Sequence, residues 1–171
     1  MTSLTYNPTT KHTLEALRTA LPQAVLLTGA PGVGLCATAK DLAWRDLAGL
    51  IQSTDKDGNP DLSARGVIRI AQIRDLQQLT RGKSRSARVI IIDDADRMNR
   101  QAQNAFLKLL EEPPEHTHFI LTSHHPDLLL PTILSRVQRI HVRPISEIAS
   151  KKLLSTKGIS DIRVQQQMLF L

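Results

Sequence analysis

Residues 24–36 read AVLLTGAPGVGLC, an apolar run followed directly by a glycine-rich loop. The run Ala24–Thr28 is too short for a helix of its own and leads into turn-forming residues, which predicts a buried β-strand. From Leu35 onward, apolar residues recur about once per helical turn, which predicts an amphipathic helix. These apolar positions are Ala39, Leu42, Ala43 and Leu47. A strand, a glycine loop and a helix in this order form a cradle of backbone N–H groups that suits phosphate.

The loop matches the phosphate-binding pattern G-x-x-x-x-G-K-[ST] at its glycines but not at its two functional side chains. Leu35 replaces the lysine that reaches the β- and γ-phosphates, and Cys36 replaces the hydroxyl that holds Mg²⁺. An isobutyl group cannot neutralise phosphate charge, and a neutral thiol is a poor ligand for a hard ion. The residues that we assign to this degenerate Walker A loop are Gly29, Pro31, Gly32, Gly34, Leu35 and Cys36. A glycine-rich turn unrelated to nucleotides is the alternative interpretation.

A second apolar run, Val89–Ile92, ends in the carboxylates Asp93 and Asp94. In phosphate-loop ATPases the first acid at such a strand end orders Mg²⁺, and a following glutamate polarises the attacking water. We therefore assign Asp93 and Asp94 to a Walker B-like position, although Asp94 is one methylene shorter than glutamate. An acidic cap of the next turn is the alternative.

The remaining pattern alternates short apolar runs with amphipathic segments, which favours an α/β fold with a parallel sheet covered by helices on both faces. Besides the two runs above, the expected strands are 118–123, 139–142 and a short one at 67–70. The first expected helix runs through Leu14, Leu17 and Leu21, with Thr9 or Thr10 as its cap. A second is expected at 71–79, and a third follows the cap Asn99 and stops at Pro113. A short helical turn is expected at 132–137. Residues 52–66 are rich in turn formers and predict a surface loop.

Residues 91–114, IIDDADRMNRQAQNAFLKLLEEPP, resemble the Walker B segment and following helix of bacterial clamp-loader subunits, which belong to the AAA+ family. Phe119–Ser123 resembles the sensor-1 strand of that family, and Leu134–Gln138 resembles its Ser-Arg-Cys segment. The likeness covers residues 10–145 and is closest to the delta-prime type of subunit. It implies a five-stranded RecA-like AAA+ core over residues 1–145, followed by a partial helical lid region over residues 146–171.

The resemblance implies a non-catalytic role, because delta-prime subunits typically do not bind ATP yet supply an arginine to the nucleotide of a neighbour. It assigns that arginine finger to Arg136, which would stabilise charge on the transferring γ-phosphoryl group in trans. It assigns a sensor-1-like role to Ser123, with His124 as the alternative. ATP and Mg²⁺ are then not expected as cofactors. The implied partners in a hetero-oligomer are the motor (gamma/tau) and delta subunits, indirectly the sliding clamp, and primer–template DNA as a further candidate.

Three departures from the family stand out. The usual four-cysteine zinc module is replaced by residues 52–66, and Cys36 is the only cysteine, so zinc is not expected. Val137 replaces the cysteine of the Ser-Arg-Cys segment, which leaves the guanidinium chemistry of Arg136 unchanged. A full subunit continues through a lid and a collar that holds the ring together, whereas only residues 146–171 follow the core here.

The bulk composition fits one ordinary domain, with 171 residues of which 41% are hydrophobic. A net charge of +6 suits polyanionic or acidic partners, although a solvated basic surface explains it equally well. Only 3% of the residues are aromatic, which argues against a stacking platform for single-stranded bases. The lack of a signal-peptide core, of a membrane-length apolar run and of paired cysteines leads us to expect a cytoplasmic location.

Two clusters of charged and titratable residues have simpler interpretations than a functional site. The basic residues Arg81, Lys83, Arg85 and Arg88 are more typical of a solvated loop than of a nucleic-acid contact. The histidines His116, His118, His124 and His125 lack the spacing of a metal site. Two other functions remain open: a weak self-contained ATPase that uses Asp93 and Asp94, and a stand-alone module that binds DNA or a replication protein without joining a ring.

Overall fold

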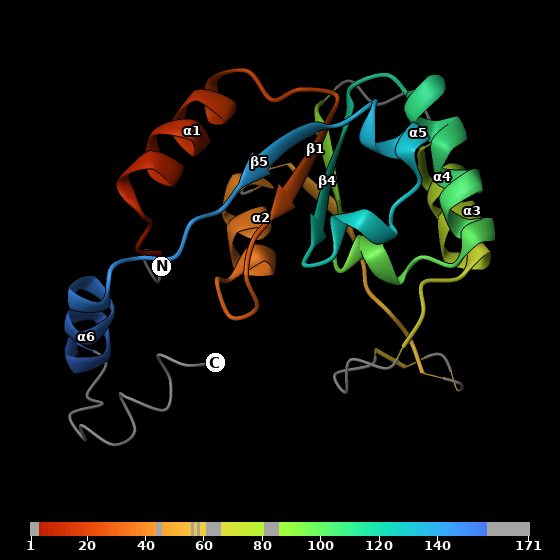
Figure 1. Cartoon of the computed structure of the whole chain (residues 1–171). Coiled ribbons are helices and arrows are strands. Elements are labelled where there is room, and N and C mark those ends of the chain that lie inside the picture. Colours follow the sequence, from red (N-terminus) through yellow and green to blue (C-terminus); the bar gives the residue numbers. More distant parts are fainter. Residues whose placement is uncertain are drawn as a thin grey trace.

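A computed structural model describes residues 4–43, 46–55, 57, 59–60, 66–80 and 86–156, and helices and strands alternate along it (Figure 1). The strands are β1 (Ala24–Thr28), β2 (Leu47–Ile51), β3 (Arg88–Ile92), β4 (Thr117–Ser123) and β5 (Gln138–His141). The α-helices are α1 (Pro8–Thr19), α2 (Leu35–Ala43), α3 (Ile70–Thr80), α4 (Arg100–Glu111), α5 (Pro131–Leu134) and α6 (Glu147–Thr156). Two short 3-10 helices, η1 (Ala95–Arg97) and η2 (Pro126–Leu128), follow β3 and β4.

The strands form one parallel sheet in the order β2-β3-β4-β1-β5. Parallel neighbours need a crossover connection, and each crossover here contains a helix. The carboxyl ends of β1, β3 and β4 therefore open at the same edge of the sheet, where Gly29, Asp93 and His124 follow them. The predicted α/β class with a five-stranded parallel sheet is confirmed.

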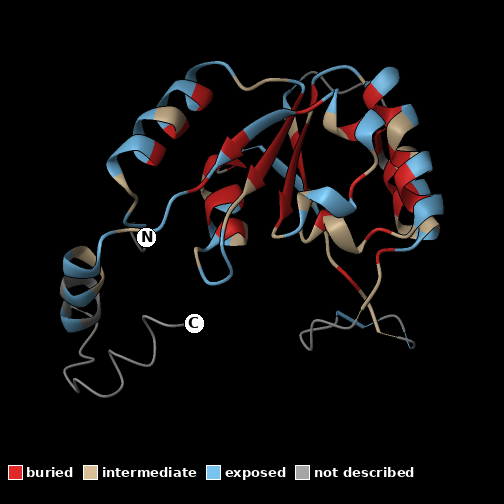
Figure 2. Ribbon diagram, in the orientation of Figure 1, coloured by how far each residue is buried: buried red, intermediate tan, exposed pale blue. Residues whose placement is uncertain are grey.

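Helices cover both faces of the sheet, with α1 and α2 on one side and α3, α4 and α5 on the other (Figure 1). The buried hydrophobic residues fall into two clusters, one on each face of the sheet. Figure 2 shows that buried residues lie on the strands and on the helices that cover them. In the cluster beneath α3 and α4, the rings of Phe106 and Phe119 form a T-shaped pair, with ring centroids 5.3 Å apart and an interplanar angle of 88°. The other cluster includes Leu17 of α1, Leu35 of α2 and Ile91 of β3.

The most apolar segments fold as their sequence predicts. β1 has the predicted bounds, and β3 and β4 each begin one residue earlier than predicted. Asn99 caps α4 as predicted, because its Oδ1 accepts a hydrogen bond from the N–H of Ala102 over 2.8 Å. α4 ends at Glu111, before the two prolines that cannot continue it.

The cap predicted for α1 is wrong. Asn7 is the cap, and its Oδ1 accepts a hydrogen bond from the N–H of Thr9 over 3.1 Å. Thr9 and Thr10 therefore lie inside the helix. Pro8 explains the earlier start, because proline lacks an N–H and suits the first position of a helix.

The second strand was predicted in the wrong place. The helix expected to continue to Leu47 ends at Ala43, and Leu47 begins β2, which pairs with β3. The strand expected at 67–70 is instead reduced to isolated bridges at Val67 and Ile68, and α3 begins at Ile70. Short apolar runs suit a helix or a strand, and pairing with the exposed edge of β3 decides between them.

The C-terminal part follows the prediction closely. The turn expected at 132–137 is the shorter helix α5, which ends at Leu134, and β5 lies one residue earlier than expected at both ends. α6 begins next to the predicted boundary at residue 146, while residues 157–171 of the predicted lid region lie outside the described residues. The division into a core over residues 1–145 and a lid region over residues 146–171 stays a prediction. No helix in the described ranges is long and apolar enough to span a membrane.

Candidate functional site

The glycine loop joins β1 to α2 at the carboxyl edge of the sheet. Gly32 and Gly34 have φ values of 80° and 83°, a left-handed conformation that other residues rarely adopt. Gly29 is required for a different reason, since a Cβ there would lie 2.8 Å from the carbonyl oxygen of Val142. The backbone of the loop thus has the turns that a phosphate cradle needs.

Leu35 occupies the lysine position of this loop and belongs to the hydrophobic core. Its side chain is 3% exposed and packs in the cluster that contains Leu14, Leu17 and Ile91. The side chain therefore contributes to packing on the α1 and α2 face, and no positive charge extends from this position toward the loop.

Cys36 occupies the hydroxyl position and lies beside Asp93 and Lys40. Burial, together with the hydrogen bond to Asp93 and its negative charge, raises the pKa of the Cys36 thiol to about 11, while Lys40 acts in the opposite direction. The thiol is therefore protonated at neutral pH and is a hydrogen-bond donor to the carboxylate rather than a metal ligand.

Asp93, at the end of β3, is surrounded by neutral donors from three different elements. Its Oδ1 accepts a hydrogen bond from the Thr122 hydroxyl over 2.7 Å, and its Oδ2 accepts one from Nε2 of Gln52 over 3.2 Å. The Cys36 thiol is the third donor. These hydrogen bonds use part of the acceptor capacity of the carboxylate, so a divalent ion there would compete with them.

Asp94 adopts a left-handed conformation, with φ 49° and ψ 54°, that orients it into its own turn. Its carboxylate lies 3.3 Å from Nε of Arg97, and its N–H donates to the Thr122 hydroxyl oxygen over 2.9 Å. Burial, followed by the charge of Asp93, raises the pKa of the Asp94 carboxyl above its ordinary value. The second acid therefore forms an ion pair with Arg97 inside its own turn.

Thr122 and Gln52 are the residues of this acidic centre that the sequence alone did not indicate. The sensor-1-like residue Ser123 is fully buried, and its hydroxyl accepts a hydrogen bond from the N–H of His125 over 3.1 Å. Its alternative, His124, places Nδ1 2.9 Å from the carbonyl oxygen of Gly29. The pairing register of β3 and β4 could have indicated Thr122, because Leu121 of β4 pairs with Ile92 of β3. The residues that follow this pair are Thr122 and Asp93.

Arg136 lies far from this centre. It follows α5 and precedes β5, whose Gln138 pairs with Val25 near the start of β1, whereas the glycine loop follows the end of β1. The structure therefore separates the arginine from the acids and the glycine loop, which lie at the opposite edge of the sheet.

The Arg136 side chain is 39% exposed and is anchored through one end of its guanidinium group. Nη1 donates to the carbonyl oxygen of Thr132 over 3.1 Å and makes a longer contact of 3.4 Å with the Ser135 hydroxyl. Nη2 lies 3.1 Å from Oε1 of Glu111. Within the described part of the chain, Nε has no partner and Nη2 has only this ion pair, so Nε–H and one N–H of Nη2 remain available.

Within the described residues, neither the basic cluster nor the histidine cluster forms a second site. Arg81, Lys83 and Arg85 lie outside the described residues, while Arg88 is part of β3 and its Nη2 donates to the Thr80 carbonyl over 3.2 Å. Arg88 therefore belongs to the fold, contrary to the prediction of a solvated loop. In the ranges that the structure covers, no three His, Cys, Asp or Glu residues gather closely enough to hold a metal ion.

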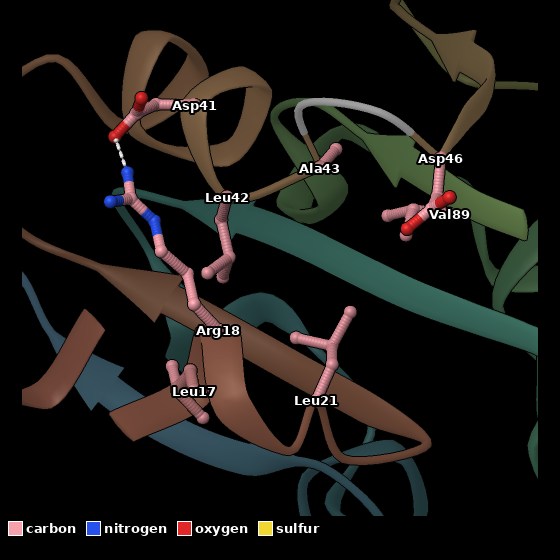
Figure 3. A pocket seen from close by; sticks show the side chains of 8 residues that line it. All are labelled: Leu17, Arg18, Leu21, Asp41, Leu42, Ala43, Asp46 and Val89. Carbon is pink, nitrogen blue, oxygen red and sulfur yellow. Dashed lines mark hydrogen bonds and ion pairs between the residues drawn. The ribbon is translucent and has the colours of Figure 1, made fainter. Parts of the chain in front are cut away.

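A cavity of about 450 Å³ lies at the other end of α2 (Figure 3). Its lining includes the apolar side chains of Leu17, Leu21 and Leu42. The charged residues Arg18, Asp41 and Asp46 also line it, and Arg18 forms an ion pair with Asp41. Val89, at the start of β3, also lines it, so the cavity opens at the edge of the sheet opposite the glycine loop. It is therefore no part of the phosphate-loop centre.

A family model described as "DNA polymerase III, delta subunit" matches residues 36–146 of the chain. The DNA polymerase III subunit delta' of Pseudomonas aeruginosa is 44% identical over 71 residues, which are 40% of this chain and 22% of that protein. The subunit delta' of Bacillus subtilis is 36% identical over 95 residues, 54% of this chain and 29% of that protein. The chain thus spans less than a third of the length of each of these relatives.

Solved structures share the fold. A DNA polymerase III gamma subunit-related protein from Thermotoga maritima superposes with a TM-score of 0.66 at 23% identity, covering 93% of this chain and 56% of that chain. The RuvB Holliday junction branch migration motor of the same organism gives a TM-score of 0.63 at 16% identity, covering 88% of this chain and 49% of that chain.

Proposed function

This chain belongs to the DNA polymerase III, delta subunit family, and from that premise we propose that it is a non-catalytic subunit of a DNA polymerase clamp loader. In this role it supplies Arg136 in trans to a neighbouring ATPase subunit during sliding-clamp loading in DNA replication. The proposed neighbours are the motor (gamma/tau) and delta subunits, and the sliding clamp and primer–template DNA are reached through the assembly.

The observation that carries the proposal is the state of the Arg136 guanidinium. Its Nη1 is hydrogen-bonded to the chain's own oxygen atoms and its Nη2 forms an exposed ion pair with Glu111, whereas Nε–H has no partner among the described residues and Nη2 keeps a second N–H. These two nitrogens form a planar fork that matches two oxygen atoms of a phosphate. An exposed, anchored fork of this kind is what a phosphoryl group on another subunit requires.

The non-catalytic part of the proposal is supported by the residues at the opposite edge. Leu35 is buried in the core where the family pattern has a lysine, and the Asp93 carboxylate is occupied by Thr122, Gln52 and Cys36. Asp94 is held by Arg97. These features oppose binding of ATP and Mg²⁺ by this chain, because neither the charge nor the open carboxylate that they require is offered.

The test is the ATPase rate of the reconstituted motor and delta subunits with this protein at saturating ATP. Arg136→Ala is expected to lower the rate at the completed site by about 10³-fold, the scale of an arginine finger. Arg139→Ala is the matched control, since Arg139 is exposed on the adjoining strand and its side chain has no partner among the described residues. Equal rates for the wild type and Arg136→Ala would overturn the proposal.

A further inference from the structure

The carboxylate of Glu111 is the acidic partner of Arg136. Glu111 is the last residue of α4, and its Oε1 lies 3.1 Å from Nη2 of Arg136, with the two side chains 46% and 39% exposed. The two residues are far apart in sequence, and the contact links the end of α4 to the end of α5. Arg136 is thus held from two directions, by Glu111 at Nη2 and by α5 oxygen atoms at Nη1.

The position of Glu111 is unfavourable for α4 itself. The C-terminal end of a helix carries a partial negative charge, so a carboxylate in its last turn is repelled. Glu112, the adjacent cap residue, is also acidic, but no side-chain contact is found for it among the described residues. Among the described residues, the ion pair with Arg136 is therefore the favourable electrostatic interaction of the Glu111 carboxylate.

The contact restricts the freedom of a long, exposed side chain. A free arginine samples many rotamers, and each must be given up when the guanidinium engages a phosphate. Glu111 and α5 remove much of that freedom in advance. The pair is solvent-exposed and therefore weak, and it engages one N–H of Nη2, which leaves Nε–H and the second N–H of Nη2 for a phosphate.

We infer that Glu111 is a positioning residue for Arg136: it orients the guanidinium so that the fork of Nε and Nη2 faces the phosphoryl group on the neighbouring subunit. This inference rests on the proposed function, since it assigns a supporting residue to the same arginine. Glu111 acts through Arg136 and does not touch the nucleotide.

The test is a double-mutant cycle in the reconstituted ATPase. Glu111→Gln keeps the shape of the side chain and removes its charge, and it is expected to lower kcat by up to about fivefold, the factor that an exposed ion pair supports. The KM for ATP stays unchanged, because the orientation matters for the transition state. Glu112→Gln is the matched control and is expected to leave the rate unchanged. In an Arg136→Ala background, Glu111→Gln is expected to have no further effect.

The outcomes separate the two ideas. A large effect of Arg136→Ala with no effect of Glu111→Gln would overturn the positioning role alone. A rise in rate for Glu111→Gln would identify Glu111 as a competing counter-ion, and a loss that persists in the Arg136→Ala background would make it a structural residue of α4. No effect of Arg136→Ala would overturn the proposed function and this inference with it. Equal thermal unfolding of all variants confirms that the rates compare folded proteins.

Discussion

Thr122 donates a hydrogen bond to Oδ1 of Asp93 over 2.7 Å, so β4 holds the carboxylate at the end of its neighbour β3. The same hydroxyl oxygen accepts the N–H of Asp94 over 2.9 Å. One side chain therefore fixes both acids of the Walker B-like pair, and it is 1% exposed. The Thr122 hydroxyl is thus a hydrogen-bond partner that both residues share.

Replacing Thr122 by valine removes this hydroxyl while keeping the shape of the side chain. The Asp94 N–H and one Asp93 oxygen then lose their partner in a buried setting, which is expected to lower the free energy of unfolding by about 1–3 kcal/mol. Urea denaturation measures the change. Thr19→Val is the control, because its hydroxyl bonds within exposed α1, and its effect should stay within about 0.5 kcal/mol. Equal losses for both variants would contradict the network.

Asp94 is expected to make stability depend on pH. Its folded-state pKa is raised above the ordinary 3.8, so ionisation is less favourable in the folded protein. The stability linked to the protonated form is fully present below pH 3.8 and is lost as the pH rises through the raised pKa. Asp94→Asn removes this loss and also suits the left-handed conformation.

We therefore expect Asp94→Asn to be more stable than the wild type at pH 7, by less than about 1 kcal/mol because solvent screens the half-exposed carboxyl. The difference should shrink toward pH 3 in urea denaturation. Asp75→Asn, at an exposed position on α3, controls for the change of charge. A wild type that gains stability relative to Asp94→Asn as the pH rises from 3 to 7 would contradict the sign of the shift.

Cys36 is expected to react slowly with alkylating reagents. Its pKa is raised from 9.0 to about 11, so at pH 8 its thiolate fraction is about 100-fold below that of an ordinary thiol. The rate of iodoacetamide labelling from pH 7 to 11 measures this, and unfolding in urea should restore the ordinary rate. Asp93→Asn should shift the profile to lower pH, because the Asp93 charge contributes to the raised pKa. A midpoint near 9 in the folded wild type would refute this account.

Nucleotide binding by the isolated chain tests whether the glycine loop and the Asp93–Asp94 pair still hold a nucleotide. We expect no saturable binding of mantADP at micromolar concentration with Mg²⁺, for the wild type or for Leu35→Lys, since Asp93 and Cys36 are unchanged in both. Leu35→Lys should also lower the free energy of unfolding by about 1–3 kcal/mol, because it brings an amine into a buried position. Leu35→Met, the packing control, should cost less than about 1.5 kcal/mol. Saturable binding by the wild type would show that the glycine loop still functions.

Much of the fold and part of the site could be predicted from local sequence. The strands β1, β3 and β4 each contain a short apolar run next to polar or turn-forming residues, which favours a buried strand, and Asn99 carries a cap signal that acts within three residues. The glycine loop and the Asp93–Asp94 pair also lie where their strands end. The roles of Ser123 and Arg136 remain predictions.

The tertiary structure alone decided which residues meet across the sheet. Leu47 could continue a helix or start a strand until β3 offered an edge to pair with, and Thr122 and Gln52 reach Asp93 only because β4 and the end of β2 flank β3. Glu111 meets Arg136 because α4 and α5 lie on the same face. Local spacing specifies elements through short-range hydrogen bonds and periodicity, whereas contacts between distant residues depend on how those elements pack.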